Sequence, residues 1–230
     1  TYRMYSSITT QNAVITGNKI KNNTICGTTA AATSYGMFNG AGTFTCNFSN
    51  NEVSNNYLPS TLAHSMYGMY NSATAPVMDF NNNLVTGNSS NGTGTLYGIY
   101  YTASAPLGST VNINNNTVTN LQKLTATGTG SIYGIYQAST PQGTLNINNN
   151  TVTGFSSAAA TLIAGIYQGG TPANFININN NKVGNFTNAG VSTMYGIYSS
   201  ATTTTQLNLS QDSVFNLTSA GSTIYGMYFT

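Results

Sequence analysis

Tyr133-Gly134-Ile135-Tyr136, followed by Ile147-Asn148-Asn149-Asn150-Thr151-Val152, is the stretch of sequence that decides the fold. Both segments recur along the 230 residues. The glycine of the first returns every 30 to 36 residues, and the last Asn of the second returns every 31 to 34. The two segments keep step while the residues between them vary in number, which is how a solenoid accommodates insertions in its loops. The sequence therefore predicts a tandem array of about seven coils of ~31–33 residues.

Side chains around the Asn-rich segment alternate between apolar and polar, as in a strand with one buried face. Three apolar columns result, and they are expected to face a shared core: Ala13, Cys46, Met78, Val111, Leu145, Ile176, Leu207; Ile15, Phe48, Phe80, Ile113, Ile147, Ile178, Leu209; and Ile20, Val53, Val85, Val118, Val152, Val183, Val214. The period is too long for leucine-rich repeats, and the apolar residues lack the helical spacing of helical solenoids. The predicted fold is all-β, a right-handed parallel β-helix (β-solenoid).

Asparagine is expected to have two structural roles in each coil. Stacked coils lie ~4.8 Å apart, so amides at one corner can hydrogen-bond to the next coil. The predicted asparagine ladder is Asn18, Asn51, Asn83, Asn116, Asn150, Asn181 and Asp212. Four residues further on, every coil has Asn or Gly, the residues that most readily adopt a left-handed conformation. This column marks a second corner at Asn22, Asn55, Gly87, Asn120, Gly154, Asn185 and Asn216.

The Tyr-Gly-Ile-Tyr segment is the best candidate for a ligand-binding surface. We place Ile135 inward and Tyr136 outward, although a bulge at the glycine would change the facing of the strand. The resulting aromatic stripe is Tyr70, Tyr100, Tyr136, Tyr167, Tyr198 and Tyr228, with Phe38 at one end. Exposed aromatic groups can contact sugars, but a ladder of stacked rings also stabilises neighbouring strands. Both roles are compatible with the sequence.

Composition argues against several classes of function. Charged residues make up only 3% of the chain, and its five basic residues form no patch that could neutralise a run of phosphates. No apolar run approaches the ~20 residues of a membrane helix. We therefore expect neither nucleic-acid binding nor membrane insertion. Cys26 and Cys46 lack metal-ligand spacing, so neither a metal site nor a cofactor is expected.

The sequence offers little for catalysis. Glu52, Asp79 and Asp212 are the only acids, and their positions in the array keep any two from working as a pair. Glu52 shares its column with Lys19 in the preceding coil, which predicts an exposed ion pair of little energetic weight. His64 has no recognisable nucleophile motif nearby and is expected to be solvent-exposed. We predict that the protein is not an enzyme, and a polysaccharide lyase is the least favoured alternative.

The Gly-Ile-Tyr and Asn-Ile-Asn-Asn-Asn-Thr-Val pattern resembles the parallel β-helix repeats of very large cell-surface proteins of Bacteroidetes-type bacteria, and the likeness spans nearly the whole chain. Such proteins are secreted and act as adhesins or surface filaments. Asp212-Ser213-Val214 also resembles the short O-glycosylation motif of those bacteria, which implies possible modification of Ser213. Fold alone does not fix function, because solenoids carry many activities.

The resemblance implies a non-catalytic, extracellular structural or adhesive module. The alternative is a carbohydrate-binding module that uses the tyrosine stripe. Residues 1–230 are expected to form a single β-solenoid domain, a section of a longer array, since aromatic segments lie at both ends and no capping element is evident. The expected partners are neighbouring solenoid segments or subunits stacked end to end, and surface glycans.

Overall fold

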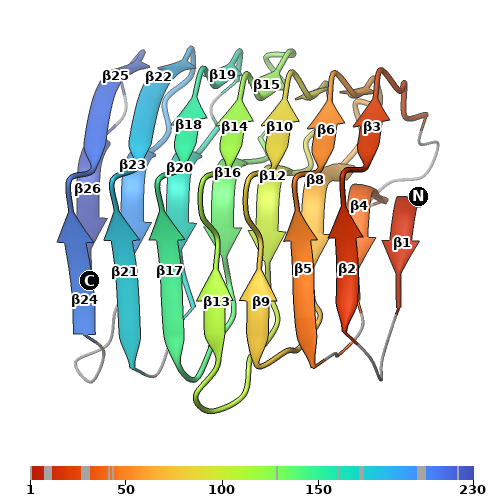
Figure 1. Ribbon diagram of the computed structural model, residues 1–230. Helices are drawn as coiled ribbons and strands as arrows, with labels where there is room; N and C mark the ends of the chain where they lie inside the picture. Colours follow the sequence, from red (N-terminus) through yellow and green to blue (C-terminus); the bar gives the residue numbers. More distant parts are fainter. Residues whose placement is uncertain are drawn as a thin grey trace.

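The computed structural model describes residues 2–7, 12–26, 32–40, 42, 44–127, 129–159, 161–170, 174–200, 206–221 and 223–230. In these residues every regular element is a β-strand, and all strand pairs are parallel (Figure 1). The chain rises along the front through β2 and β3, descends behind through β4 and returns to the front at β5, one step nearer the C-terminal end (Figure 1). This path makes a right-handed parallel β-solenoid, which confirms the predicted fold.

Each coil contributes strands to three sheets that run along the solenoid axis (Figure 1). The first sheet contains the Tyr-Gly-Ile-Tyr segments: β1 (Tyr2–Ser6), β4 (Thr33–Asn39), β8 (Ser65–Asn71), β12 (Leu96–Tyr101), β16 (Ile132–Gln137), β20 (Ile163–Gln168), β23 (Met194–Ser199) and β26 (Ile224–Phe229). The second contains β2 (Ala13–Thr16), β5 (Thr45–Ser49), β9 (Val77–Asp79), β13 (Thr110–Asn112), β17 (Thr144–Asn148), β21 (Phe175–Asn179) and β24 (Gln206–Ser210).

The third sheet follows the Asn-rich corner. Its main strands are β3 (Lys19–Lys21), β6 (Glu52–Ser54), β10 (Leu84–Thr86), β14 (Thr117–Thr119), β18 (Thr151–Thr153), β22 (Lys182–Asn188) and β25 (Ser213–Ser219). Beyond the second corner it continues through the short strands β7 (Tyr57–Leu58), β11 (Ser89–Ser90), β15 (Gln122–Lys123) and β19 (Ser156–Ser157). The register is strict: equivalent residues pair from coil to coil, as Val85 does with Val53 and Val118.

The three apolar columns meet in one continuous core. Their members in the interior coils are fully buried, whereas Leu207, Leu209 and Val214 in the last coil are only partly buried. Apolar side chains are thus buried by stacking one coil on the next, as expected for a repeat that has no core of its own. The predicted core columns are confirmed.

Both corners depend on left-handed backbone. All seven residues of the predicted column have φ between 51° and 77°. A second left-handed column, which the sequence analysis missed, directly precedes the ladder and consists of Gly17, Asn50, Asn82, Asn115, Asn149, Asn180 and Gln211. Asn tolerates this conformation at modest cost, so an Asn-rich turn can supply both the corner and the hydrogen-bonding side chain.

Candidate functional site

Both tyrosines of each aromatic segment lie on the outer face of the first sheet. In β16 the burial order is buried Ile132, half-buried Tyr133, buried Gly134 and Ile135, half-buried Tyr136 and buried Gln137. The inward Ile135 and outward Tyr136 are as predicted, but simple alternation would have placed Tyr133 inside. Two consecutive inward residues, Gly134 and Ile135, bring Tyr133 back to the surface.

The glycine of this segment is required by close packing. A Cβ atom built on Gly134 would lie 2.4 Å from the Val152 Cγ1 atom and 2.5 Å from the Gly165 carbonyl oxygen of the next coil. No side chain fits in that space, so the strand can turn two successive residues inward only where the first of them is glycine.

The outer face therefore has two tyrosine columns. The predicted stripe lies here, and its members are half-buried rather than fully exposed: Tyr70, Tyr100, Tyr136, Tyr167, Tyr198 and Tyr228. The first column, which simple alternation would have placed inside, runs beside it and comprises Tyr35, Tyr67, Tyr97, Tyr133, Tyr195 and Tyr225. In β20, Ala164 takes the place of the first tyrosine.

Rings in both columns stack mainly face to face along the axis. Tyr67 and Tyr97 have centroids 4.5 Å apart and planes 8° apart, and Tyr167 and Tyr198 lie 4.2 Å apart with planes 11° apart. Each such ring face is covered by the ring of the next coil, so the columns expose ring edges and hydroxyl groups. Desolvation by burial and the neighbouring tyrosines raise the pKa of Tyr100 to about 12. Tyr100 therefore presents a neutral hydroxyl at physiological pH.

The predicted asparagine ladder is confirmed and fully connected. The Asn116 Oδ1 atom accepts hydrogen bonds from the Asn83 backbone N–H at 2.9 Å and from the Asn83 Nδ2 at 3.0 Å. Its own Nδ2 donates to the Phe80 carbonyl oxygen at 2.7 Å and to the Asn150 Oδ1 at 3.0 Å. The same pattern recurs from Asn51 to Asn150. Each amide thus ties its own coil to both neighbours.

Further polar ladders were not foreseen. Asn23, Asn56 and Asn88 form a second amide ladder directly after the left-handed residue of the second corner. On the outer face of the second sheet, Asp79 accepts from Asn112, and the chain of amides continues through Asn146 to Asn177. A polar column also lies inside the core, at Asn39, Asn71, Tyr101, Gln137, Gln168 and Ser199. The sequence signal for such ladders is the recurrence of polar residues at equivalent positions of successive coils.

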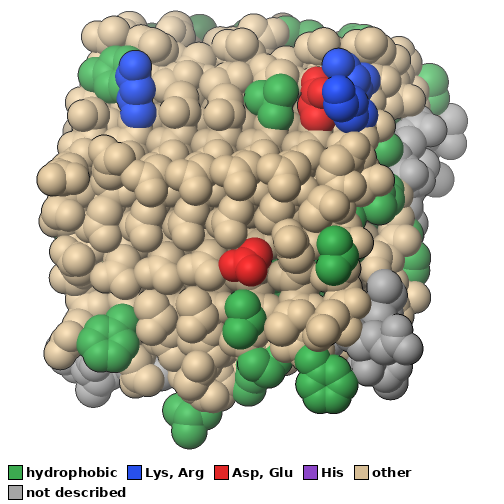
Figure 2. Space-filling model, viewed as in Figure 1, with side chains coloured by type: hydrophobic (Ala, Val, Ile, Leu, Met, Phe, Trp, Pro, Cys, Tyr) green, Lys and Arg blue, Asp and Glu red, His purple; other side chains and the backbone are tan. Residues whose placement is uncertain are grey.

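The three acids lie apart in the array. Glu52 pairs with Lys21 at 3.0 Å and with Lys19 at 3.9 Å, so the expected Lys19 pair exists and a closer Lys21 pair accompanies it. Figure 2 shows how few charged side chains lie on the face formed by the second and third sheets. Within the part of the chain that the structure describes, no cluster of three or more His, Cys, Asp or Glu residues could hold a metal ion. In the same residues, no helix could span a membrane.

His64 is buried, and the expectation that it would be exposed is wrong. Only 2% of its surface is accessible, and its Nε2 lies 2.8 Å from the Ser34 Oγ, which is also buried. Burial lowers the pKa of the imidazole. His64 belongs to the loop between β7 and β8, and its bond to Ser34 of the preceding coil is a tertiary contact that the Ser/Thr-rich sequence does not reveal. Solvent does not reach the two side chains, so we assign the pair a structural role.

Lys123 is a second buried basic residue. Its side chain enters the same corner, where Nζ donates to the Gly92 carbonyl oxygen at 2.7 Å and to that of Gly94. Burial lowers its pKa from 10.5 to about 8. Two backbone carbonyl groups thus hold the ammonium group in place of a carboxylate.

This burial predicts alkaline stabilisation. Below pH 8 both the folded and the unfolded chain carry the charge, and the folded chain bears the full cost of burying it. Between about pH 8 and 10.5 only the folded chain loses the proton, so the free energy of unfolding rises by up to about 1.4 kcal/mol per pH unit. Urea unfolding between pH 7.5 and 9.5 measures the rise. Lys123→Met should abolish it and exposed Lys182→Met should retain it; equal slopes in the two variants would contradict the assignment.

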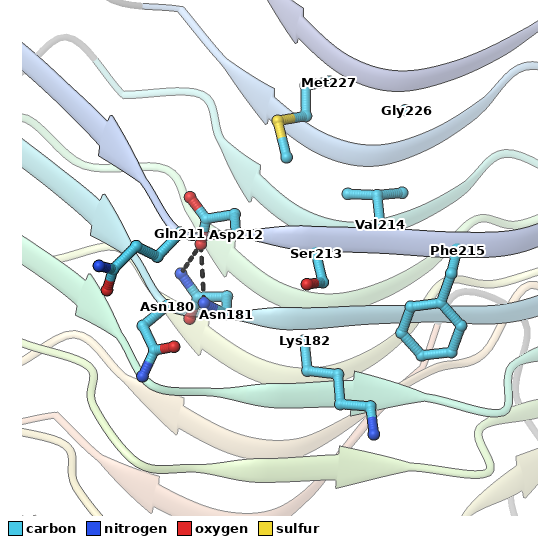
Figure 3. Close-up of a pocket in the computed structure, with 10 residues that line it drawn as sticks. All are labelled: Asn180, Asn181, Lys182, Gln211, Asp212, Ser213, Val214, Phe215, Gly226 and Met227. Atoms are coloured by element: carbon cyan, nitrogen blue, oxygen red, sulfur yellow. Dashed lines mark hydrogen bonds between the residues drawn. The ribbon is translucent and has the colours of Figure 1, made fainter.

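The C-terminal edge carries an open hollow, and Asp212 lies in it beside Asn181 (Figure 3). The Asp212 Oδ1 accepts from the Asn181 N–H at 2.7 Å and from its Nδ2 at 2.8 Å, as an Asn would. The second oxygen, Oδ2, takes the place of an amide nitrogen that in other coils donates to the preceding coil. It is buried without a hydrogen-bond partner, and burial raises the carboxyl pKa.

We therefore expect the Asp212→Asn substitution to stabilise the last described coil against local unfolding at neutral pH. A carboxyl group whose folded pKa is raised stabilises the fold below its ordinary pKa of 3.8, and the stabilisation disappears as pH rises through the folded value. In the native chain, amide-exchange protection of β24 and β25, corrected for intrinsic rates, should fall as the pH rises above 3.8 and the carboxyl group loses its proton. The variant should keep its protection. Identical pH profiles for both proteins would refute this role of the carboxylate.

Ser213 is exposed on β25, directly after Asp212. Its accessibility permits the modification that the resemblance implies, and O-glycosylation remains a prediction. Comparison of the chain with family models, with curated proteins and with solved structures finds no match. The fold and its ladders therefore define the class, a parallel β-solenoid, and function has to be argued from the surfaces themselves.

Proposed function

We propose that this chain is a non-catalytic structural module of an extracellular cell-surface protein, an adhesin or filament of the kind found in Bacteroidetes-type bacteria. The observation that carries the proposal is the continuity of the ladders. The amide ladder runs unbroken from Asn18 to Asp212, and ring contacts run from Tyr5 to Tyr228. Every coil thus serves as the template for the next, which suits a module that acts as a rigid rod.

The uncharged polar surface supports the same role. With 3% charged residues, the outer faces consist mainly of amide and hydroxyl groups, many of them already bonded to one another along the axis. Such groups leave few unpaired donors for unwanted association and depend little on salt. A rod exposed to variable ionic surroundings benefits from both properties.

The expected partner is a further solenoid segment or subunit at the C-terminal edge. Ile224, Met227 and Phe229 are 41%, 37% and 42% exposed there, and the described strands β24, β25 and β26 have one unpaired edge each. The chain passes through the second, third and first sheets in turn, and β26 of the first sheet completes the last described coil. A partner that continues the solenoid past β26 therefore begins with a strand of the second sheet.

Rod formation tests the proposal. Sedimentation velocity and electron microscopy should reveal stiff rods, and chains carrying two copies of residues 7–230 in tandem should form rods of twice the length with one cooperative unfolding transition. Flexible or independently unfolding halves would argue against a structural rod. Polysaccharide cleavage that is lost in the Glu52→Gln or the Asp79→Asn variant would contradict the proposal and show that the protein is an enzyme.

The second candidate is carbohydrate binding by the tyrosine columns, which is favoured by the outward position of all predicted members. Because stacking covers most ring faces, glycans would be held by the hydroxyl edges and not by stacking on the rings. Glycan-array binding should then be lost in a Tyr136→Phe, Tyr167→Phe double variant, which removes only hydroxyls. Loss in the Tyr136→Ala, Tyr167→Ala variant alone would instead indicate damage to the face.

A further inference from the structure

The tyrosine columns form an unbroken chain of ring contacts along the solenoid. In the second column, successive centroids from Tyr5 through Phe38, Tyr70, Tyr100, Tyr136, Tyr167 and Tyr198 to Tyr228 are separated by 4.2 to 5.7 Å. The first column gives 4.5 to 5.3 Å between neighbours from Tyr35 to Tyr133. Contacts of 4.7 to 5.3 Å join the two columns in the third, fourth, fifth, seventh and eighth aromatic strands.

In β20 only the second column contributes an aromatic ring. Ala164 interrupts the first column, and the ring of Tyr167 lies edge-on to both Tyr133 at 5.3 Å and Tyr195 at 6.4 Å. Among the ring contacts of the described residues, every path from β16 to β23 passes through Tyr167. By contrast, Tyr100 has a parallel neighbour, Tyr97, that connects the same coils.

Phenol is the most readily oxidised aromatic group in this chain, which contains no Trp. Loss of one electron from a tyrosine makes its hydroxyl strongly acidic, so the proton leaves and a neutral phenoxyl radical remains. The half-buried hydroxyls of the columns can pass this proton to solvent. Rings in contact then exchange the radical when one phenoxyl takes an electron and a proton from the next tyrosine.

We propose that the tyrosine columns are a relay for one-electron oxidation, in which a radical formed at one end of the solenoid travels along the rings to the other and Tyr167 is the obligatory link. The substrate class is a high-potential one-electron oxidant. In each entry step the oxidant gains one electron, a tyrosine loses one electron and one proton, and water accepts the proton. The relay would carry oxidising equivalents past the methionines of the core.

Cys26 provides a starting point for the test. It is exposed in the first coil, whereas the Cys46 thiol is buried with its pKa raised to about 12, so a ruthenium(II) polypyridyl label attaches selectively to Cys26. Laser excitation with a cobalt(III) ammine as electron acceptor generates ruthenium(III), a one-electron oxidant for tyrosine. A 3-aminotyrosine residue placed at position 228 is oxidised more easily than tyrosine and traps the radical about 29 Å away, six strand spacings from β4.

The expected result is a 3-aminotyrosyl radical signal, by electron paramagnetic resonance, in the labelled protein. Tyr167→Phe keeps the ring but not the oxidisable hydroxyl and should lose most of the signal, whereas Tyr100→Phe, bypassed through Tyr97, should retain it. Circular dichroism checks that both variants fold. Absence of the signal in the parent protein, equal signals in the two variants, or dityrosine in place of the trapped radical would each overturn the relay.

Discussion

Replacing Asn116 by Ala should lower the free energy of unfolding by about 3–5 kcal/mol, the range for breaking a buried polar network. Four groups lose a partner together: the Asn83 N–H, the Asn83 side-chain amide, the Phe80 carbonyl and the Asn150 amide oxygen. Asn116 is 1% exposed, so solvent cannot replace the lost hydrogen bonds without opening the corner. Chemical denaturation monitored by circular dichroism gives the difference.

Asn18→Ala is the matched control, because it removes the same side chain from the same ladder at its first described position. Asn18 is partly exposed and donates only to Asn51 and to its own coil. Water can satisfy the groups left behind, and we expect a loss of about 1 kcal/mol or less. Similar losses at both positions would mean that the ladder contributes through local turn preference rather than through coil-to-coil bonding.

Gly134→Ala should be about as damaging, with a loss of roughly 3 kcal/mol or more, at the upper end of what overpacking costs in a rigid interior. The new methyl group would lie 2.4 Å from the Val152 Cγ1 atom and 2.5 Å from a backbone oxygen, and the latter cannot move without breaking the sheet. The strand must either separate from the next coil or turn Tyr133 inward. Thermal unfolding and tyrosine near-ultraviolet circular dichroism report both outcomes.

Gly226→Ala tests the same motif position where the space is open. No atom lies within 4 Å of the Cβ that this substitution adds, because β26 is the last strand of the described sheet. Removing glycine there should be neutral or slightly stabilising, by up to about 1 kcal/mol. If Gly226→Ala proved as costly as Gly134→Ala, backbone conformation and not coil packing would explain the glycine.

The sequence by itself determined the repeat, the coil boundaries, the three core columns, one left-handed corner and the ladder from Asn18 to Asp212. These features have a common physical origin: a side chain in a solenoid meets the same position of the next coil. A column of like residues in the sequence therefore reports a spatial contact directly. The fold class follows from nothing more than alternation and period.

Only the tertiary structure decided where the columns deviate from simple alternation and what the loops cover. Tyr133 faces outward because Gly134 can approach the next coil more closely than any other residue, a contact that strand parity does not encode. His64 is buried in the loop before β8, where no periodic signal marks it, whereas Lys123 is buried because it takes the inward position of β15, level with the buried Ser90 and Ser157. The repeat specifies what every coil shares, whereas the exceptions depend on packing between particular coils.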